Sequence, residues 1–158
     1  MIRLAVEQDV LQLVQLMRKL AVFEGYAQQF SITAADLQER GFSTRHSPEF
    51  IAWVAPGIDG TLQGYAVVYI IPFTFDLRPT VVLKELFVEE SARGQRLGDE
   101  LFAAVVAHAR AITARLLRWQ VLPNNEAAKR FYNQRGGQSD AAWESWSLDL
   151  DKINAIEK

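Results

Sequence analysis

The chain has 158 residues, of which 49% are hydrophobic, a size and composition that suit one compact domain. Its 17 basic and 19 acidic residues give a formal net charge of −2, which excludes the broad positive field that nucleic-acid or anionic-membrane binding requires. The chain has no cysteine, so disulfides, thiolate zinc sites and a cysteine acyl-enzyme are excluded as well. We therefore expect a single domain over residues 1–158 that binds neither nucleic acid nor a membrane.

The first residues predict no export signal. Residues 1–6 alternate in polarity and are followed by acidic Glu7 and Asp9, unlike the apolar core of a secretory signal. No apolar stretch approaches the roughly 20 residues of a membrane span. We expect a soluble protein of the cytoplasm.

Hydrophobic periodicity predicts strands and helices in a mixed order. Apolar residues recur at helical spacing in two segments, whereas β-branched and apolar runs flank the glycine-containing turn over 57–60. In chain order, the expected elements are a strand over 2–6, a helix over about 10–20, a short helix capped by Thr33 and Asp36 and stopped at Gly41, strands over 50–56, 62–71 and 81–88, a helix over 98–112, a strand over 117–121, a helix over 126–135, and a strand over 143–148 that closes the sheet. This order predicts an α+β or α/β domain with a mixed central β-sheet flanked by helices.

A basic loop with glycines, residues 93–98, joins the apolar strand over 81–88 to the amphipathic helix over 98–112. Glycine lets a backbone approach a diphosphate closely, and the following helix turns its positive end toward the anion. Arg93 and Arg96 can add charge-assisted hydrogen bonds to phosphate oxygens. A Rossmann site would need a third glycine and an acidic residue roughly 20 positions later, and a P-loop would need Gly-Lys-Ser/Thr. The chain has neither pattern.

A second segment places the amide pair Asn124-Asn125 before a helix that carries Tyr132 near its end. A tyrosine phenol, whose pKa is about 10 in water, stays protonated at neutral pH and can donate its proton to a departing thiolate. Taken alone, the pair Phe131-Tyr132 would more simply predict two aromatic residues that pack a helix against a sheet.

Together, the two segments resemble the acyl-coenzyme A site of the GNAT N-acetyltransferases. The family's first motif, Gln/Arg-x-x-Gly-x-Gly/Ala, is matched at Arg93 and Gly98, whereas Arg96 stands where the middle glycine would be. The second motif, Asn-x-x-Ala-x-x-Phe-Tyr-x-x-x-Gly, is matched at Asn125, Ala128, Phe131, Tyr132 and Gly136. The resemblance implies the GNAT acyl-coenzyme A N-acyltransferase fold and an N-acetyltransferase activity that uses acetyl-coenzyme A as co-substrate.

The resemblance also assigns roles to residues. It implies main-chain contacts to the pantetheine arm from Leu86, Phe87 and Val88, and to the pyrophosphate from Arg93, Gly94, Gln95, Arg96, Leu97, Gly98 and Asp99. In the second segment it implies coenzyme contacts from Asn125, Ala128, Lys129 and Phe131, with Tyr132 as the general acid. The general base is expected to be a carboxylate such as Glu85 or Glu24, or a water chain leading to one. His46 and His108 lack partners at triad or metal-ligand spacing, so neither is a candidate base and no metal is expected.

Within that family, the chain is most similar to the diamine N-acetyltransferases of the spermidine/spermine type, through short matches at residues 18–24, 32–37, 73–76 and 144–146. A cationic acceptor should be held by carboxylates and an aromatic face. The candidate acceptor-binding residues are Phe23, Glu24, Tyr26, Asp76, Lys84, Glu85, Glu144 and Trp146. The subfamily resemblance also implies a homodimer.

One departure from that subfamily concerns the acceptor. Its Leu-Glu-Asp run is replaced here by Leu83-Lys84-Glu85, and adjacent residues of a regular strand point to opposite faces. If Lys84 faces the cleft, an acceptor that carries its own carboxylate, such as an amino acid, is favoured. If a bulge turns Glu85 inward, a diamine remains possible.

The predicted function is direct transfer of an acetyl group from acetyl-coenzyme A to a primary amine in a ternary complex. The acceptor is expected to be a small diamine-like, polyamine-like or amino-acid-like molecule. Two alternatives stay open: a protein lysine or N-terminal acetyltransferase, which needs an open groove for a peptide, and a non-catalytic coenzyme A-binding regulatory module. Phe23, Tyr26 and Trp146 favour a closed aromatic pocket, and hence the small acceptor.

Overall fold

The computed structural model describes residues 1–152 of the chain. Two compact units, Met1–Gln120 and Val121–Lys158, are described separately. The first unit contains a complete sheet with helices on both faces, and the second contains one helix and irregular segments.

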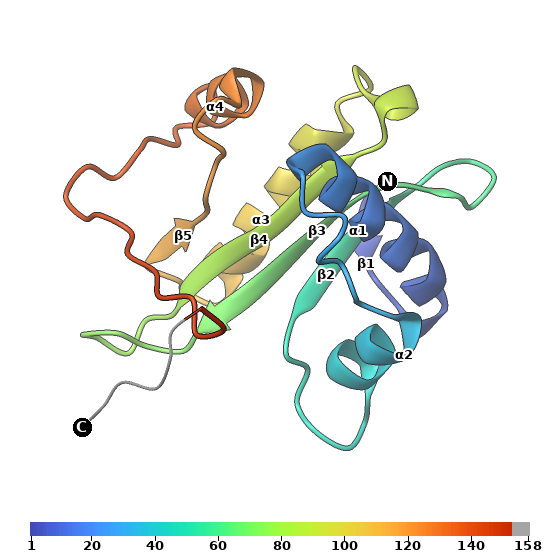
Figure 1. Ribbon diagram of the computed structural model, residues 1–158, viewed down its shortest axis with the longest axis horizontal. Coiled ribbons are helices and arrows are strands. Elements are labelled where there is room, and N and C mark those ends of the chain that lie inside the picture. The colour runs from blue at the N-terminus through green and yellow to red at the C-terminus, as the bar shows by residue number, and fades with distance from the viewer. Residues whose placement is uncertain (153–158) are drawn as a thin grey trace. The chain divides into compact units, whose positions relative to one another are not determined.

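The first unit is built on a five-stranded mixed sheet in the order β1-β2-β3-β4-β5 (Figure 1). The strands are β1 (Arg3–Leu4), β2 (Ile51–Pro56), β3 (Leu62–Ile71), β4 (Thr80–Val88) and β5 (Leu116–Arg118). Neighbouring strands from β1 to β4 are antiparallel, whereas β4 and β5 are parallel. The mixed sheet predicted from the sequence is therefore confirmed.

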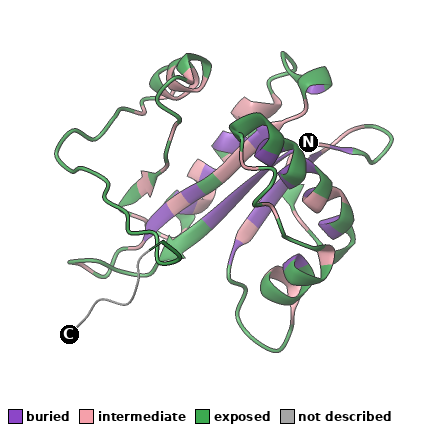
Figure 2. Cartoon of the chain, viewed as in Figure 1, coloured by how far each residue is buried: buried purple, intermediate pink, exposed green. Residues whose placement is uncertain are grey.

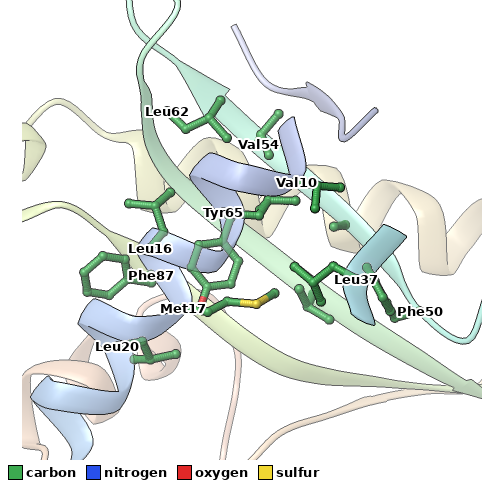
Figure 3. Packing of buried hydrophobic residues seen from close by; sticks show 13 residues of the cluster. Val10, Leu16, Met17, Leu20, Leu37, Phe50, Val54, Leu62, Tyr65 and Phe87 are labelled. Carbon is green, nitrogen blue, oxygen red and sulfur yellow. The ribbon is translucent and has the colours of Figure 1, made fainter. Parts of the chain in front are cut away.

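Helices cover both faces of this sheet. Helix α1 (Val10–Glu24) packs its apolar stripe on the face that carries Val54, Tyr65 and Phe87 (Figure 3). Helix α3 (Leu97–Ala111) lies on the other face, where His108 contacts the Trp53 ring at 5.2 Å between centroids. The buried residues accordingly form a band along the sheet between the two helices (Figure 2). These packed layers hold the ends of β4 and α1 in fixed positions, and the candidate site lies there.

The ends of the helices follow local signals, of which the capping box of the short helix was predicted. Helix α1 ends at Gly25, whose φ of +84° is the left-handed cap that glycine favours. The short helix α2 (Ala34–Leu37) begins with the expected capping box, in which Thr33 and Asp36 bond each other's main-chain N–H groups. A π-helical turn, η2 (Gln38–Phe42), continues α2 past the predicted stop. The short 3-10 turns η1 (Glu7–Asp9) and η3 (Glu90–Ala92) precede α1 and follow β4.

The second unit corrects one prediction. The strand expected over 143–148 is absent, and the described residues after helix α4 (Glu126–Asn133) are irregular. Trp143 and Trp146 are 80% and 89% exposed, so their alternation with polar residues does not mark a buried face. A strand needs a partner strand to bond its main chain, and the described part of this unit offers none. The strand expected over 117–121 also pairs only over Leu116–Arg118.

Candidate active site

Within residues 1–152, the edge of β4 that faces β5 is unpaired over most of its length. Strand β5 pairs only with Thr80, Val81 and Val82, while β4 continues to Val88. The N–H of Glu89 bonds the carbonyl of Gln63 on the β3 side, at 2.8 Å. Because main-chain groups alternate between the two edges of a strand, those of Leu86 and Val88 point to the unpaired edge. This edge can bond an extended ligand that carries amide groups.

The loop after β4 bends so that the start of α3 is open to an anion. Gly94 and Arg96 both have left-handed backbone conformations, with φ of +81° and +65°. Arg96 is the N-cap of α3, and the N–H groups of the first helical turn have no carbonyl partner within the helix. The loop and the positive end of this 15-residue helix therefore suit a diphosphate.

Arg96 adopts the conformation that a glycine would adopt at this position. The replacement of the family's middle glycine thus leaves the loop bend in place, at the cost of a side chain in the left-handed region. We expect Arg96→Gly to raise the free energy of unfolding by up to about 1 kcal/mol, because relief of strain outweighs the entropy of glycine. The measurement is denaturant unfolding of the purified variant.

The matched control for that measurement is Arg93→Gly in the same loop. Arg93 has a φ of −67°, so a glycine there relieves no strain and removes a hydrogen bond. Arg93→Gly should lower the free energy of unfolding. An Arg96→Gly variant that loses as much stability as Arg93→Gly would show that the left-handed conformation stores no strain.

The side chain of Arg93 links the loop to helix α1. Its Nε donates to the Val88 carbonyl at 3.2 Å, and its guanidinium lies 5.7 Å from the centroid of the Phe23 ring. One turn earlier on α1, Lys19 forms an ion pair with Glu89. Phe23, predicted to line the acceptor site, is therefore held against the loop over 93–98. A ligand amide that bonds the Val88 carbonyl would share it with Arg93.

A β-bulge settles the orientation of Lys84 and Glu85. Glu85 is paired with Val67 and Leu83 with the next residue of β3, Val68, so Lys84 is the extra residue on β4. Glu85 consequently shares a face with Tyr65, and Lys84 is exposed. Of the two arrangements considered from the sequence, the structure has the one in which the bulge turns Glu85 inward.

The half-buried Glu85 carboxylate lies in a cluster of tyrosines and acids. The Tyr65 hydroxyl donates to Glu85 Oε2 at 2.8 Å. Burial is the main cause that raises the pKa of Glu85, and nearby Glu24 raises it further. Burial, with the charges of Glu85 and Glu24, raises the pKa of Tyr26 to about 12. Three predicted acceptor-site residues, Glu24, Tyr26 and Glu85, are therefore close enough to interact electrostatically.

Tyr65 was missed in the sequence. It lies in an apolar strand, where a tyrosine ordinarily predicts a core residue, and it is indeed completely buried. The only available signal was its hydroxyl, since a buried phenol needs a hydrogen-bonding partner.

The structure does not bring Asp76 into this cluster. Asp76 lies in the loop between β3 and β4, beyond their last pair, Ile71 and Thr80. Its carboxylate pairs with Arg115 at 3.2 Å and accepts a hydrogen bond from the main chain of Arg78. The charge of Asp76 is therefore already balanced at the end of the β3–β4 hairpin, and its contact with an acceptor remains a prediction.

The second unit places its predicted residues around α4. Asn125 is the N-cap, and its Oδ1 accepts from the N–H of Ala128 at 3.0 Å, so the motif asparagine and alanine form the helix start. Lys129 is paired with Glu126 at 2.8 Å. Phe131 and Tyr132 contact each other edge to face, with 5.1 Å between ring centroids. Their coenzyme and acid roles remain predictions.

The last two predicted acceptor residues, Glu144 and Trp146, also belong to this unit. The indole N–H of Trp146 donates to Glu144 Oε2 at 3.3 Å. Both residues follow α4 in an irregular segment, and their contact with an acceptor remains a prediction.

Residues 1–152 lack two further features. Within that range, no three histidine, aspartate or glutamate side chains are grouped so that they could hold a metal ion. No helix in the same range is both long and apolar enough to span a membrane.

Comparison with known proteins identifies the family. The model of the Acetyltransferase (GNAT) family matches residues 14–137. Thialysine N-epsilon-acetyltransferase of Mus musculus is 32% identical over 152 residues, which cover 92% of this chain and 88% of that protein. The chain therefore belongs to the GNAT acetyltransferase family and is an acyltransferase enzyme.

Two more similarities agree with this family. Spermidine/spermine N(1)-acetyltransferase-like protein 1 of Homo sapiens is 27% identical over 155 residues, which cover 93% of this chain but only 22% of that protein. The crystal structure of a probable acetyltransferase superposes with a TM-score of 0.80 at 23% identity, covering 95% of this chain and 97% of that one. The predicted fold and the resemblance to the diamine subfamily are thus confirmed.

Proposed function

We propose that this enzyme transfers an acetyl group from acetyl-coenzyme A directly to the primary amine of a small molecule in a ternary complex. The position of Glu85 carries the proposal. The β4 bulge turns its carboxylate toward Tyr65, and the next residue, Leu86, presents its main-chain groups to the unpaired strand edge. One strand thus carries, on adjacent residues, a carboxylate that can bind the amine and main-chain groups that can bond the amides of the pantetheine arm.

Three proton transfers follow from this chemistry. Acetyl-coenzyme A supplies the thioester whose carbonyl carbon a neutral amine attacks. Glu85 accepts the proton that the ammonium group loses, and its raised pKa makes it a better base than an ordinary carboxylate. As the carbon–nitrogen bond forms and the carbon–sulfur bond breaks, the departing thiolate takes a proton from a phenol, which the family motif assigns to Tyr132. The phenolate then recovers a proton from the nitrogen that becomes the amide.

The acceptor is expected to carry a second charged group. The names of the relatives connect one with thialysine, an amino acid with a side-chain amine, and another with spermidine and spermine, which are polyamines. Glu24 and Glu85 suit an amine in either class. The inward Glu85 keeps a diamine possible as an acceptor. The positive charge of Lys84, exposed on the adjacent residue, nevertheless favours an acceptor that carries its own carboxylate over a polycation.

The test is a panel of amines with acetyl-coenzyme A, measured by release of free thiol. The panel includes lysine and 1,5-diaminopentane, which differ only in the carboxylate. We expect lysine to be the better substrate of the two, and Lys84→Glu to reverse the preference. Tight coenzyme binding without thiol release for any amine would favour the non-catalytic module. Turnover of peptides alone would favour the protein acetyltransferase.

We also propose a cytoplasmic homodimer, as the subfamily resemblance implies. Light scattering of the purified protein tests its assembly, since the mass of a single chain would exclude the dimer.

A further inference from the structure

Tyr65 is the one residue whose side chain hydrogen-bonds Glu85 within residues 1–152. Its ring lies in the core between α1 and the sheet, 6.2 Å from the centroid of the Phe87 ring (Figure 3). Its hydroxyl reaches Glu85 Oε2 at 2.8 Å from the neighbouring strand. Because the ring is fully buried, the surrounding side chains fix the place of the hydroxyl.

The direction of this hydrogen bond is also fixed. Burial is the largest cause that raises the pKa of Tyr65 well above the usual value for tyrosine, so the hydroxyl stays protonated. An ionised carboxylate can only accept, so Tyr65 must be the donor. Oxygen Oε2 of Glu85 is therefore committed to Tyr65. Oxygen Oε1 forms no hydrogen bond within the described part of the chain.

We propose that Tyr65 is a positioning residue for acetyl transfer, whose hydroxyl fixes the orientation of the Glu85 carboxylate and reserves Oε1 for the proton of the amine. This inference rests on the proposed function, because it assigns Glu85 as the base. Tyr65 itself is buried beneath the acid and acts only through it.

Several charged or titratable groups act on Glu85 from the elements around it. Burial and Glu24 of α1 disfavour its ionised form, whereas the Tyr65 bond and Lys84 of β4 favour it. Two further tyrosines have pKa values that Glu85 raises: Tyr26, just after α1, and Tyr69 of β3. Among these groups, Tyr65 is the one that bonds the carboxylate directly.

The variant Tyr65→Phe keeps the buried ring and removes only the donor. Without that donor, the ionised carboxylate loses a partner, so Glu85 should bind its proton more tightly. The acidic limb of the pH profile of kcat/KM should then move to higher pH. We expect kcat at neutral pH to fall roughly tenfold, because the base is partly protonated and less well oriented.

The test has two readouts on the whole protein. The first is an NMR titration of the carboxyl carbons in the coenzyme-free protein, which reports the pH midpoint of ionisation of Glu85 without turnover. The second is the pH profile of kcat/KM with acetyl-coenzyme A and the best amine of the panel. Tyr69→Phe is the matched control. Tyr69 lies on the same face of the same strand as Tyr65, but within the described residues its hydroxyl does not bond Glu85. The control should leave the Glu85 midpoint at the wild-type value.

The outcomes separate this inference from the proposed function. The positioning role would be supported if Tyr65→Phe alone raises the ionisation midpoint of Glu85 and shifts the pH profile of kcat/KM. An unchanged midpoint in Tyr65→Phe, or an equal shift in Tyr69→Phe, would overturn it. A shifted midpoint with an unchanged rate profile would also overturn it, because Glu85 would then not be the base. If no amine is turned over, the proposed function fails, while the titration still decides whether Tyr65 controls Glu85.

Discussion

Glu85→Gln is expected to lower kcat/KM by about 10²–10⁴-fold at neutral pH, the range usually contributed by a general base. Glutamine keeps the shape of the side chain, and its amide oxygen can still accept the hydrogen bond from Tyr65. It cannot take a proton from the ammonium group of the acceptor. The measurement is the rate of thiol release with the best amine of the panel, together with the dissociation constant of the coenzyme, which should change little.

The same substitution should make the coenzyme-free protein more stable at neutral pH. The pKa of Glu85 is raised in the folded state, so the folded protein binds this proton more tightly than the unfolded chain does. The stability of the wild type therefore falls as pH rises from the ordinary glutamate pKa through the raised value, and the loss is complete above it. Glutamine, which stays neutral, removes that loss. The two proteins should differ least at low pH, which unfolding at several pH values can check.

Glu90→Gln is the matched control for both measurements, because Glu90 is an exposed glutamate on η3. Its substitution should change neither the rate nor the pH dependence of stability. Full activity in Glu85→Gln would assign the base to another group, such as Glu24. A loss of stability at neutral pH would show that the charged form of Glu85 is favoured in the fold.

Tyr132→Phe is expected to lower kcat by about 10²–10⁴-fold, because the departing thiolate loses its proton donor. The ring is retained, so its edge-to-face contact with Phe131 should survive and α4 should keep its structure. The dissociation constant of coenzyme A should therefore stay within a few-fold of the wild-type value. Steady-state kinetics and calorimetric titration with coenzyme A measure the two quantities.

The pH dependence gives a second check on Tyr132. If the phenol is the acid, the wild-type rate falls at high pH as the phenol ionises, and this fall should be missing in Tyr132→Phe. Equal kcat in the two proteins would remove the assigned role. A large loss of coenzyme affinity with unchanged kcat would instead make Tyr132 a binding residue.

The elements that carry strong periodicity were predictable from the sequence. The apolar stripes of α1 and α3, and the strands β2, β3 and β4, lie where the pattern placed them, within a few residues at the ends. The loop over 93–98 was found through its glycines and its position between strand and helix, and its coenzyme role remains a prediction. Local sequence decides these features, because the spacing of side chains along one element determines which of them can be buried together.

The features that depend on a partner element were not predictable. Whether Lys84 or Glu85 turns inward is decided by the pairing of β4 with Val67 and Val68 of another strand. The hydroxyl of Tyr65 acquires its role only from the acid on the neighbouring strand. The strand expected over 143–148 failed for the same reason, since alternation alone does not supply a strand to pair with.

The extra residue in β4 lets Leu83 and Glu85 lie on opposite faces of the sheet. In a regular strand Leu83 and Glu85 would lie on the same side, yet Leu83 is needed in the apolar layer under α3 and Glu85 beside Tyr65. The bulge at Lys84 reverses the alternation of faces along β4. The Lys84 side chain is exposed and packs in neither the layer under α1 nor the layer under α3. Evolution can therefore alter the charge at this position with little effect on folding. In the proposed mechanism, single substitutions there change the acceptor preference while Glu85 keeps its place.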